Sequence, residues 1–120
     1  MEELLVLDYN GNGYFSHFRY GGWRIAYLNY APMFTKAGIT YLERHNETDE
    51  VFILLEGEAT LFMGETAKEV KMEKFSSYIV KKGAWHNIAV SENAKVLIVE
   101  NADTGKQNSE YMPYVFERYE

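Results

Sequence analysis

Short apolar runs separated by glycine and asparagine turns constrain the fold of this chain more than any other feature. The runs WRIAYLNY, EVFILLEG and KVLIVEN are rich in β-branched and aromatic residues and have the length of single strands. Turn signals separate such runs at spacings of roughly 8 to 12 residues, and helical periodicity never extends beyond about two turns. The pattern predicts an all-β domain of roughly eight to eleven short strands, which fits an antiparallel jelly roll.

The turn residues also predict particular connections. The Asn-Gly pairs in DYNGNGYF (residues 8–15) and the glycines in YGGW (residues 20–23) should have strands on both sides. Gly57 should turn the chain after EVFILLE, and Gly64 should turn EATLFM back toward AKEVKM. We expect NIAV and KVLIVEN to form a hairpin across SENA.

Composition limits the number of domains and the classes of partner. A chain of 120 residues, 47% hydrophobic, suits one core, so we expect a single domain over residues 1–120. A formal charge of −6, with basic residues scattered along the chain, argues against a nucleic-acid partner. The start, MEELLVLDY, carries acids where a signal peptide needs bases, and its apolar run is too short for a membrane span. We therefore expect a cytoplasmic protein with no membrane partner.

Two histidines and two glutamates form the candidate metal site. The chain has no cysteine, so the side chains of His, Asp and Glu must supply any transition-metal ligands. Glu43 and His45 share one face of an extended strand, and Glu50 can return beside them if residues 46–49 form a loop. The glycine three residues before His86 permits a turn that directs this imidazole into the sheet. Such a donor set suits Zn, Mn, Fe, Ni or Cu.

The spacing of these residues resembles the first sequence motif of the cupins. His45, Glu50 and Gly57 reproduce the motif's second His, its four-residue gap, its Glu, its six-residue gap and its Gly, over about residues 38–57. The first His of the motif falls on Glu43. The ligand set implied by the resemblance therefore has two His and two Glu, where cupins have three His and one Glu.

A second cupin motif is matched in part. Gly83 and His86 have its spacing, over about residues 75–90, while Lys81 replaces its Pro and Val90 replaces its Asn. The resemblance is to small single-domain cupins and implies a jelly-roll barrel, also called a double-stranded β-helix. It further implies a divalent metal or a small organic ligand inside the barrel, and assembly as a homodimer.

The first motif allows a second register. Cupins also occur with a three-residue gap before the Glu, and that gap would place the His pair on Arg44 and Asn46. Neither residue is a good metal ligand, and His45 would then face outward. We prefer the four-residue gap, because it keeps the histidine on the site.

Other readings apply to the same residues. A strand histidine that is hydrogen-bonded to a neighbouring acid is common without any metal. Aromatic residues such as Tyr27 and Phe52 are expected to line the barrel and with it the ligand pocket. Trp85 precedes His86, so it should lie at the rim of the pocket, where it could stack on a ligand.

Two functions remain open at this point. One is a metal-dependent isomerase, lyase or dioxygenase acting on a sugar or organic acid, in which the metal is a Lewis acid and Glu43 or a tyrosine moves protons. The other is a non-catalytic binding or sensing protein whose metal site is degenerate or empty. The fold alone does not decide between them. The aromatic-rich amino-terminal third also favours a homodimer, because one small barrel cannot bury so much apolar surface.

Overall fold

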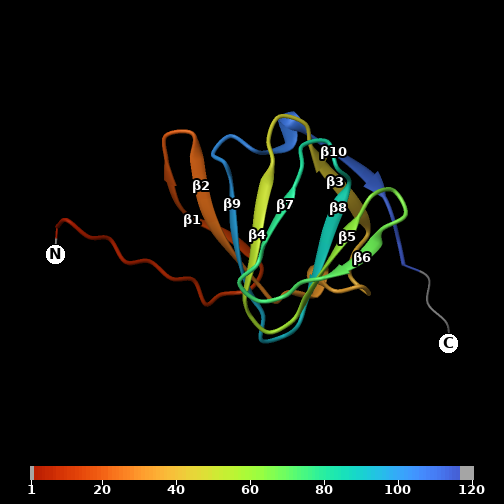
Figure 1. The fold of residues 1–120 in the computed structure, drawn as a ribbon, viewed down its shortest axis with the longest axis horizontal. Helices are drawn as coiled ribbons and strands as arrows, with labels where there is room; N and C mark the ends of the chain where they lie inside the picture. The colour runs from red at the N-terminus through yellow and green to blue at the C-terminus, as the bar shows by residue number, and fades with distance from the viewer. Residues whose placement is uncertain (1, 117–120) are drawn as a thin grey trace.

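Two five-stranded antiparallel sheets lie face to face in the computed structural model, which describes residues 2–116 (Figure 1). The strands of the first sheet, in spatial order, are β1 (Tyr14–Tyr20), β2 (Trp23–Asn29), β9 (Lys95–Asn101), β4 (Glu50–Glu56) and β7 (Ser77–Val80). Those of the second are β10 (Ser109–Pro113), β3 (Tyr41–His45), β8 (His86–Val90), β5 (Ala59–Met63) and β6 (Lys68–Lys71). From β3 onward the chain crosses between the sheets at every step except the β5–β6 hairpin. The prediction of an all-β antiparallel jelly roll is confirmed.

Helical structure is confined to two short 3₁₀ turns in the described part of the chain. They are η1 (Pro32–Phe34) and η2 (Lys106–Asn108). No helix within residues 2–116 is long and apolar enough to cross a membrane. The predicted single domain covers residues 1–120, of which residues 1 and 117–120 lie outside the described part.

The core forms between the inner faces of the two sheets. Side chains alternate along each strand, so Val96 and Ile98 of β9 point inward while Leu97 points outward. The second sheet contributes inward residues such as Leu61 and Ile88. Because side chains alternate between the two faces of a strand, polar residues that share the inward phase also point into the interior.

The structure corrects two predicted connections. NIAV and KVLIVEN do not form a hairpin, because β8 pairs with β3 and β5 of one sheet while β9 pairs with β2 and β4 of the other. Residues 91–94 therefore cross between sheets. The Asn-Gly segment has a strand only after it, since residues 4–10 form no strand and β1 begins at Tyr14. The predicted hairpins at YGGW and Gly64 are present as β1–β2 and β5–β6.

A second apolar cluster covers the outer face of the second sheet. Ile39, Leu42, Phe62 and Ala67 are buried there. The chain after β10 packs over them, and the rings of Phe62 and Phe116 are 4.6 Å apart. The outer face of this sheet is thus covered by the chain's own carboxyl-terminal segment.

Gly57 makes a tight crossing between the sheets. Its φ is +73°, and a Cβ there would lie 2.7 Å from the Cα of Ala94 and from the Oγ of Ser91. Gly64 has a similar φ of +80°, but nothing lies within 4 Å of its Cβ position. Gly57→Ala should therefore lower the free energy of unfolding by about 2–4 kcal/mol, and Gly64→Ala by only about 1 kcal/mol. Urea unfolding of the two variants checks this, and equal losses would contradict it.

Candidate functional site

Three strands from both sheets bring the predicted site residues together. Glu43 and His45 alternate with Arg44 on β3 and point into the barrel, whereas Arg44 points out and pairs with Glu110 at 2.8 Å. Glu50 begins β4 in the opposite sheet. This is the arrangement expected for the four-residue gap. In it, His45 faces the interior.

Two loop contacts fix the relative positions of these strands. The carboxylate of Asp49 accepts a hydrogen bond from the backbone N–H of Lys82 at 2.9 Å, and the N–H of Gly83 donates to the carbonyl of His45 at 2.7 Å. Gly83 has a φ of +81°, which a glycine adopts without strain. The loop before Glu50 and the turn before His86 are thereby tied together, so their side chains meet.

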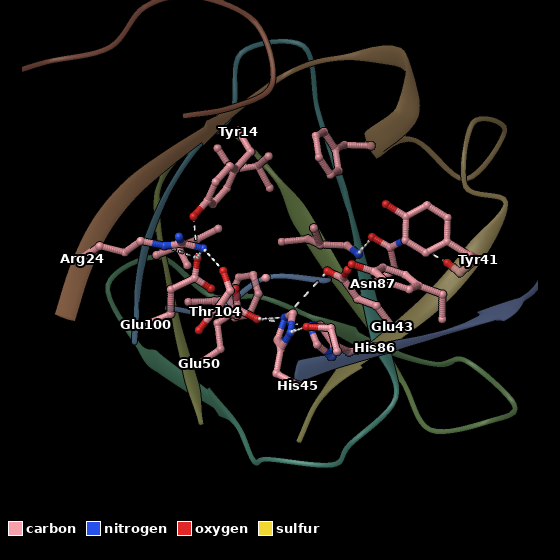
Figure 2. A pocket seen from close by; sticks show the side chains of 18 residues that line it. Tyr14, Arg24, Tyr41, Glu43, His45, Glu50, His86, Asn87, Glu100 and Thr104 are labelled. Carbon is pink, nitrogen blue, oxygen red and sulfur yellow. Dashed lines mark hydrogen bonds and ion pairs between the residues drawn. The ribbon is translucent and has the colours of Figure 1, made fainter. Parts of the chain in front are cut away.

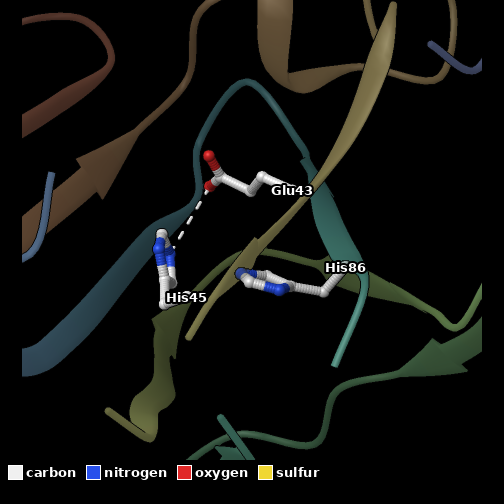
Figure 3. A group of neighbouring side chains, drawn as sticks. All are labelled: Glu43, His45 and His86. Atoms are coloured by element: carbon white, nitrogen blue, oxygen red, sulfur yellow. Dashed lines mark ion pairs between the residues drawn. The ribbon is translucent and has the colours of Figure 1, made fainter. Parts of the chain in front are cut away.

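The two imidazoles converge on one carboxylate oxygen of Glu50 (Figure 2), and Glu43 lies beside them (Figure 3). The Nε2 atoms of His45 and His86 each lie 3.2 Å from Oε1 of Glu50, and Oε1 of Glu43 lies 3.8 Å from Nε2 of His45. His86 and Glu50 are almost fully buried, with 2% and 5% of their surface exposed. Four ionisable side chains therefore share one enclosed space.

The second nitrogen of each ring is also held. Nδ1 of His86 is 3.0 Å from the carbonyl oxygen of Ala84, which can only accept, so this nitrogen carries a proton. Nδ1 of His45 is 2.8 Å from Oγ of Ser109. Contacts of this kind orient metal-binding histidines and leave Nε2 free to bind.

Burial and pairing shift the pKa values of the site in opposite directions. Burial alone would lower the pKa of His45 and of His86, but the hydrogen bonds and charge of Glu50 outweigh it, so both pKa values are raised. Burial would raise the pKa of Glu50, but hydrogen bonds from the two imidazoles lower it. The pKa of Glu43 is raised by burial. Without a metal, this pairing favours the ionised carboxylate of Glu50 and the protonated forms of the two imidazoles.

The donor set fits a divalent transition metal. The ligand atoms of Glu43, His45 and His86 lie within 4.8 Å of one another, and so do those of His45, Glu50 and Glu100. Two imidazole nitrogens with carboxylate oxygens are typical ligands for Zn, Mn, Fe, Ni or Cu. The residues present therefore match the chemistry of such an ion.

A cavity of about 260 Å³ extends from these four residues to a second polar group (Figure 2). Tyr14 donates a hydrogen bond to Oε1 of Glu100, and Arg24 donates to the same oxygen from Nη2 at 3.0 Å. Burial, and then the charge of Glu50, raise the pKa of Glu100 to about 7. The buried hydroxyl of Thr104 also lines this cavity and finds no hydrogen-bond partner among the described residues.

Sequence reasoning missed this second group, although part of it left a signal. Glu100 has the same phase along β9 as Val96 and Ile98, so the alternation of side chains predicts that its carboxylate lies in the core. Arg24 likewise has the same phase along β2 as the buried Ala26. Tyr14 and Thr104 left no such signal, because neither lies in a predicted strand pattern.

Of the three aromatic residues expected at the ligand pocket, Phe52 alone lines this cavity. Its ring lies in the cavity with its centroid 6.0 Å from that of His86. Trp85 lies outside, because His86 faces inward and neighbouring strand residues face opposite ways; its ring packs under Arg44 at 4.5 Å. Tyr27 is also outside and stacks on His17 on the outer face of the first sheet.

The family assignment follows from the sequence match that spans this site. A family model described as the cupin domain matches residues 33–100, a range that includes all four candidate ligands. The chain belongs to the cupin domain family. Comparison with curated proteins gives no sequence match.

Solved structures similar to this cupin agree in fold. Pac13 from Streptomyces, a nucleoside dehydratase solved as a variant with uridine, has a TM-score of 0.68 at 6% identity and covers 90% of this chain and 84% of its own. A cupin-2 domain protein from Shewanella frigidimarina has a TM-score of 0.60 at 19% identity. The match covers 78% of this chain and 84% of that protein. KdgF from Halomonas sp. has a TM-score of 0.60 at 6% identity. The match covers 76% of this chain and 78% of KdgF. At these identities the likeness is one of fold alone.

The metal-free protein should be most stable under mildly acidic conditions. The raised pKa values of His45 and His86 contribute stability below their ordinary value of 6.5, and this stability is lost as pH rises through the raised values. The lowered pKa of Glu50 contributes above its ordinary 4.5 and is lost on acidification. Thermal unfolding in EDTA should therefore give the highest midpoint between about pH 4.5 and 6.5. A midpoint that rises steadily from pH 6 to 9 would disprove this.

Proposed function

We propose that this cupin binds one divalent transition metal through Glu43, His45, Glu50 and His86 and takes a small hydroxyl-bearing organic molecule beside it. The observation that carries the proposal is the convergence of both Nε2 atoms on Glu50, each at 3.2 Å, inside a partly open cavity. The function supported best is metal-dependent acid–base chemistry, of the isomerase or lyase type. A bound metal would supply Lewis-acid polarisation of a substrate oxygen.

The charges of the cavity favour an uncharged ligand. Among the described residues that line it, Arg24 is the one Lys or Arg, and its guanidinium is paired with Glu100 at 3.0 Å. A divalent ion would be balanced by the carboxylates of Glu43 and Glu50, so no positive charge would remain for a carboxylate substrate. We therefore favour a sugar-like, neutral molecule over an organic acid.

The chain's own residues supply hydrogen-bonding groups on both sides of such a ligand. In the metal-free site Glu43 can hold a proton, because burial raises the pKa of its carboxyl. The unpartnered hydroxyl of Thr104 can bond to a ligand hydroxyl, and the Tyr14–Glu100 pair lies in the same cavity. Phe52 provides an apolar wall.

A second function is favoured by a separate observation. Glu50 and the two imidazoles satisfy one another without a metal, as paired charges in a buried site require. A cupin with such a site can bind a small molecule without turnover and act as a sensor. Metal content separates the two functions.

Metal binding should depend on His86 and not on His17, the remaining histidine outside the site. Wild-type protein and His17→Ala should each bind about one Zn²⁺ or Mn²⁺ per chain, whereas His86→Ala should bind at least about a hundredfold more weakly, since even outer-sphere changes cost 10–100-fold. Titration calorimetry and elemental analysis measure this, with circular dichroism to show that each variant is folded. Equal binding by all three proteins would rule out the proposed site.

Ligand class can be tested with Thr104. Neutral pentoses, hexoses and uridine, the last chosen because Pac13 was solved with it, should raise the unfolding midpoint of the metal-loaded protein more than the corresponding sugar acids do. Thr104→Val should weaken binding of the best neutral probe about tenfold, while Thr104→Ser, which keeps the hydroxyl, should not. Stabilisation by the sugar acids alone would show that the preference for a neutral ligand is wrong.

A further inference from the structure

An aromatic pair lines the cavity on the side of Glu43. Tyr41 has the same inward phase along β3 as Glu43 and His45. Tyr111 of β10 pairs directly with Glu43 across the second sheet, and its side chain lines the cavity too. The rings of Tyr41 and Tyr111 meet edge to face, with centroids 5.6 Å apart and planes at 75°. An aromatic wall therefore begins directly beside one of the four candidate metal ligands.

The same two rings also line a shallow groove of about 480 Å³ outside the cavity. Thr40, Lys106 and Pro113 are its other lining residues, and most of the lining is apolar. Pro113 pairs with Tyr41, so it continues the wall along the sheet. Because β10 is the edge strand of its sheet, the wall reaches solvent there, and Tyr111 is 48% exposed. The cavity and the groove thus share the aromatic pair as a common wall.

The polar residues of the cavity determine which end of a ligand reaches this wall. Figure 2 shows Tyr41 beyond Glu43, on the opposite side of the site from Arg24 and Glu100. The unpartnered hydroxyl of Thr104 lies on the side of Glu100 (Figure 2). A ligand whose hydroxyl groups contact Thr104 and the metal ligands therefore directs its remaining part toward the aromatic pair.

The size of the cavity indicates that a larger ligand must extend into the groove. Its volume of about 260 Å³ is below the roughly 300–1,000 Å³ typical of pockets that hold drug-sized molecules. One small ring therefore occupies most of it. A second ring attached to the first has to lie outside, where the groove adjoins the cavity.

The chemistry of the groove favours an aromatic second ring. Two phenol rings at 75° present a ring face and a ring edge, and a third aromatic ring packs well on either. Lys106 is the one charged residue among the described residues that line the groove. Its ammonium group suits the π face or the acceptor atoms of an aromatic ring.

We propose that this groove is a second ligand subsite, which binds an aromatic ring attached to the sugar-like molecule in the cavity. The ligand would then be an aryl glycoside or a nucleoside. The inference rests on the proposed function, since the sugar-like part has to occupy the cavity beside the metal ligands. Tyr41 and Tyr111 determine specificity in this arrangement by stacking on the ring, and the acid–base chemistry is left to other residues.

Matched ligands test the subsite by titration calorimetry on the Zn²⁺-loaded protein. Phenyl β-glucoside is compared with methyl β-glucoside, and uridine with methyl β-riboside, so that each pair differs in the aromatic ring. The aromatic member of one pair should bind at least about fivefold more tightly, because one base–aromatic stack is worth about 5- to 150-fold in affinity. The pair that shows the difference identifies the ligand as an aryl glycoside or a nucleoside.

The other outcomes separate this inference from the proposed function. If the methyl glycosides bind and the aromatic ring adds less than about twofold in both pairs, the subsite is wrong and the proposed function stands. If none of the four neutral probes binds, the sugar-like ligand is wrong and the subsite is overturned with it.

Substitutions then test the aromatic wall. Tyr111→Ala should bring the affinity for the preferred aromatic probe to within about twofold of its methyl partner, whereas Tyr111→Phe, which keeps the ring, should retain the preference. Tyr20→Ala is the matched control, because Tyr20 is a 70% exposed tyrosine at the β1–β2 turn. The Zn²⁺ content of all three variants should equal that of the wild type, since none of them changes a candidate ligand.

A further variant covers the case in which Tyr111→Ala does not fold. Tyr111→Leu removes the ring and keeps an apolar side chain, and it should lose the preference for the aromatic probe in the same way. Circular dichroism shows whether each variant is folded. A folded Tyr111→Ala or Tyr111→Leu protein that keeps the full preference overturns the assignment of the ring to this groove.

Discussion

The contact of Glu50 with two imidazoles is the interaction on which the site depends. Glu50 belongs to the first sheet, and His45 and His86 belong to the second, so one carboxylate joins the two layers inside the barrel. Removing such charges from water costs several kcal/mol for each ion, and only close pairing with further hydrogen bonds offsets that cost. Ser109 and the carbonyl of Ala84 provide those further bonds. The donor set is therefore organised by the fold before any metal or ligand arrives.

Three glutamates share the cavity, but their surroundings differ. Hydrogen bonds from two imidazoles lower the pKa of Glu50, while Glu43 has only a distant imidazole contact. Glu100 is held by Arg24 and Tyr14 and faces the charge of Glu50. A divalent ion would lower the pKa of Glu43, because a nearby double positive charge favours the carboxylate. Glu43, the residue that replaces a cupin histidine, thus adds a negative charge where cupins have a neutral ligand. If a divalent ion binds through the four proposed ligands, that change would lower the net charge of the ion and its ligands from +1 to zero.

Much of the fold and part of the site follow from local sequence rules. Turn glycines and strand-length apolar runs predict the jelly roll, and the gaps between His45, Glu50 and His86 place these three residues near one another. These rules fail where two strands that are neighbours in sequence belong to different sheets. NIAV and KVLIVEN are close in sequence and strongly β-forming, yet the four residues between them cross the barrel, because each strand finds its hydrogen-bond partners in a different layer.

Side-chain direction explains the remaining errors in the predicted site. Trp85 is expected at the rim because it precedes His86, and Tyr27 is expected as an aromatic residue lining the barrel. Both point outward, since Trp85 is next to the inward-facing His86 and Tyr27 lies between the buried Ala26 and Leu28. The same phase argument identifies Glu100 and Arg24 as interior residues. Thr104 could not be found in this way, since it lies in the loop after β9, where no period applies.

The two sheets solve the same packing problem in different ways. Each sheet has an apolar outer face in addition to its core face, and a chain of this size has few residues outside the strands to cover the two outer faces. The chain after β10 covers the outer face of the second sheet, so Leu42 and Phe62 are almost fully buried. The amino-terminal arm would have to fold back across five strands to do the same for the first sheet, and it extends outward instead (Figure 1).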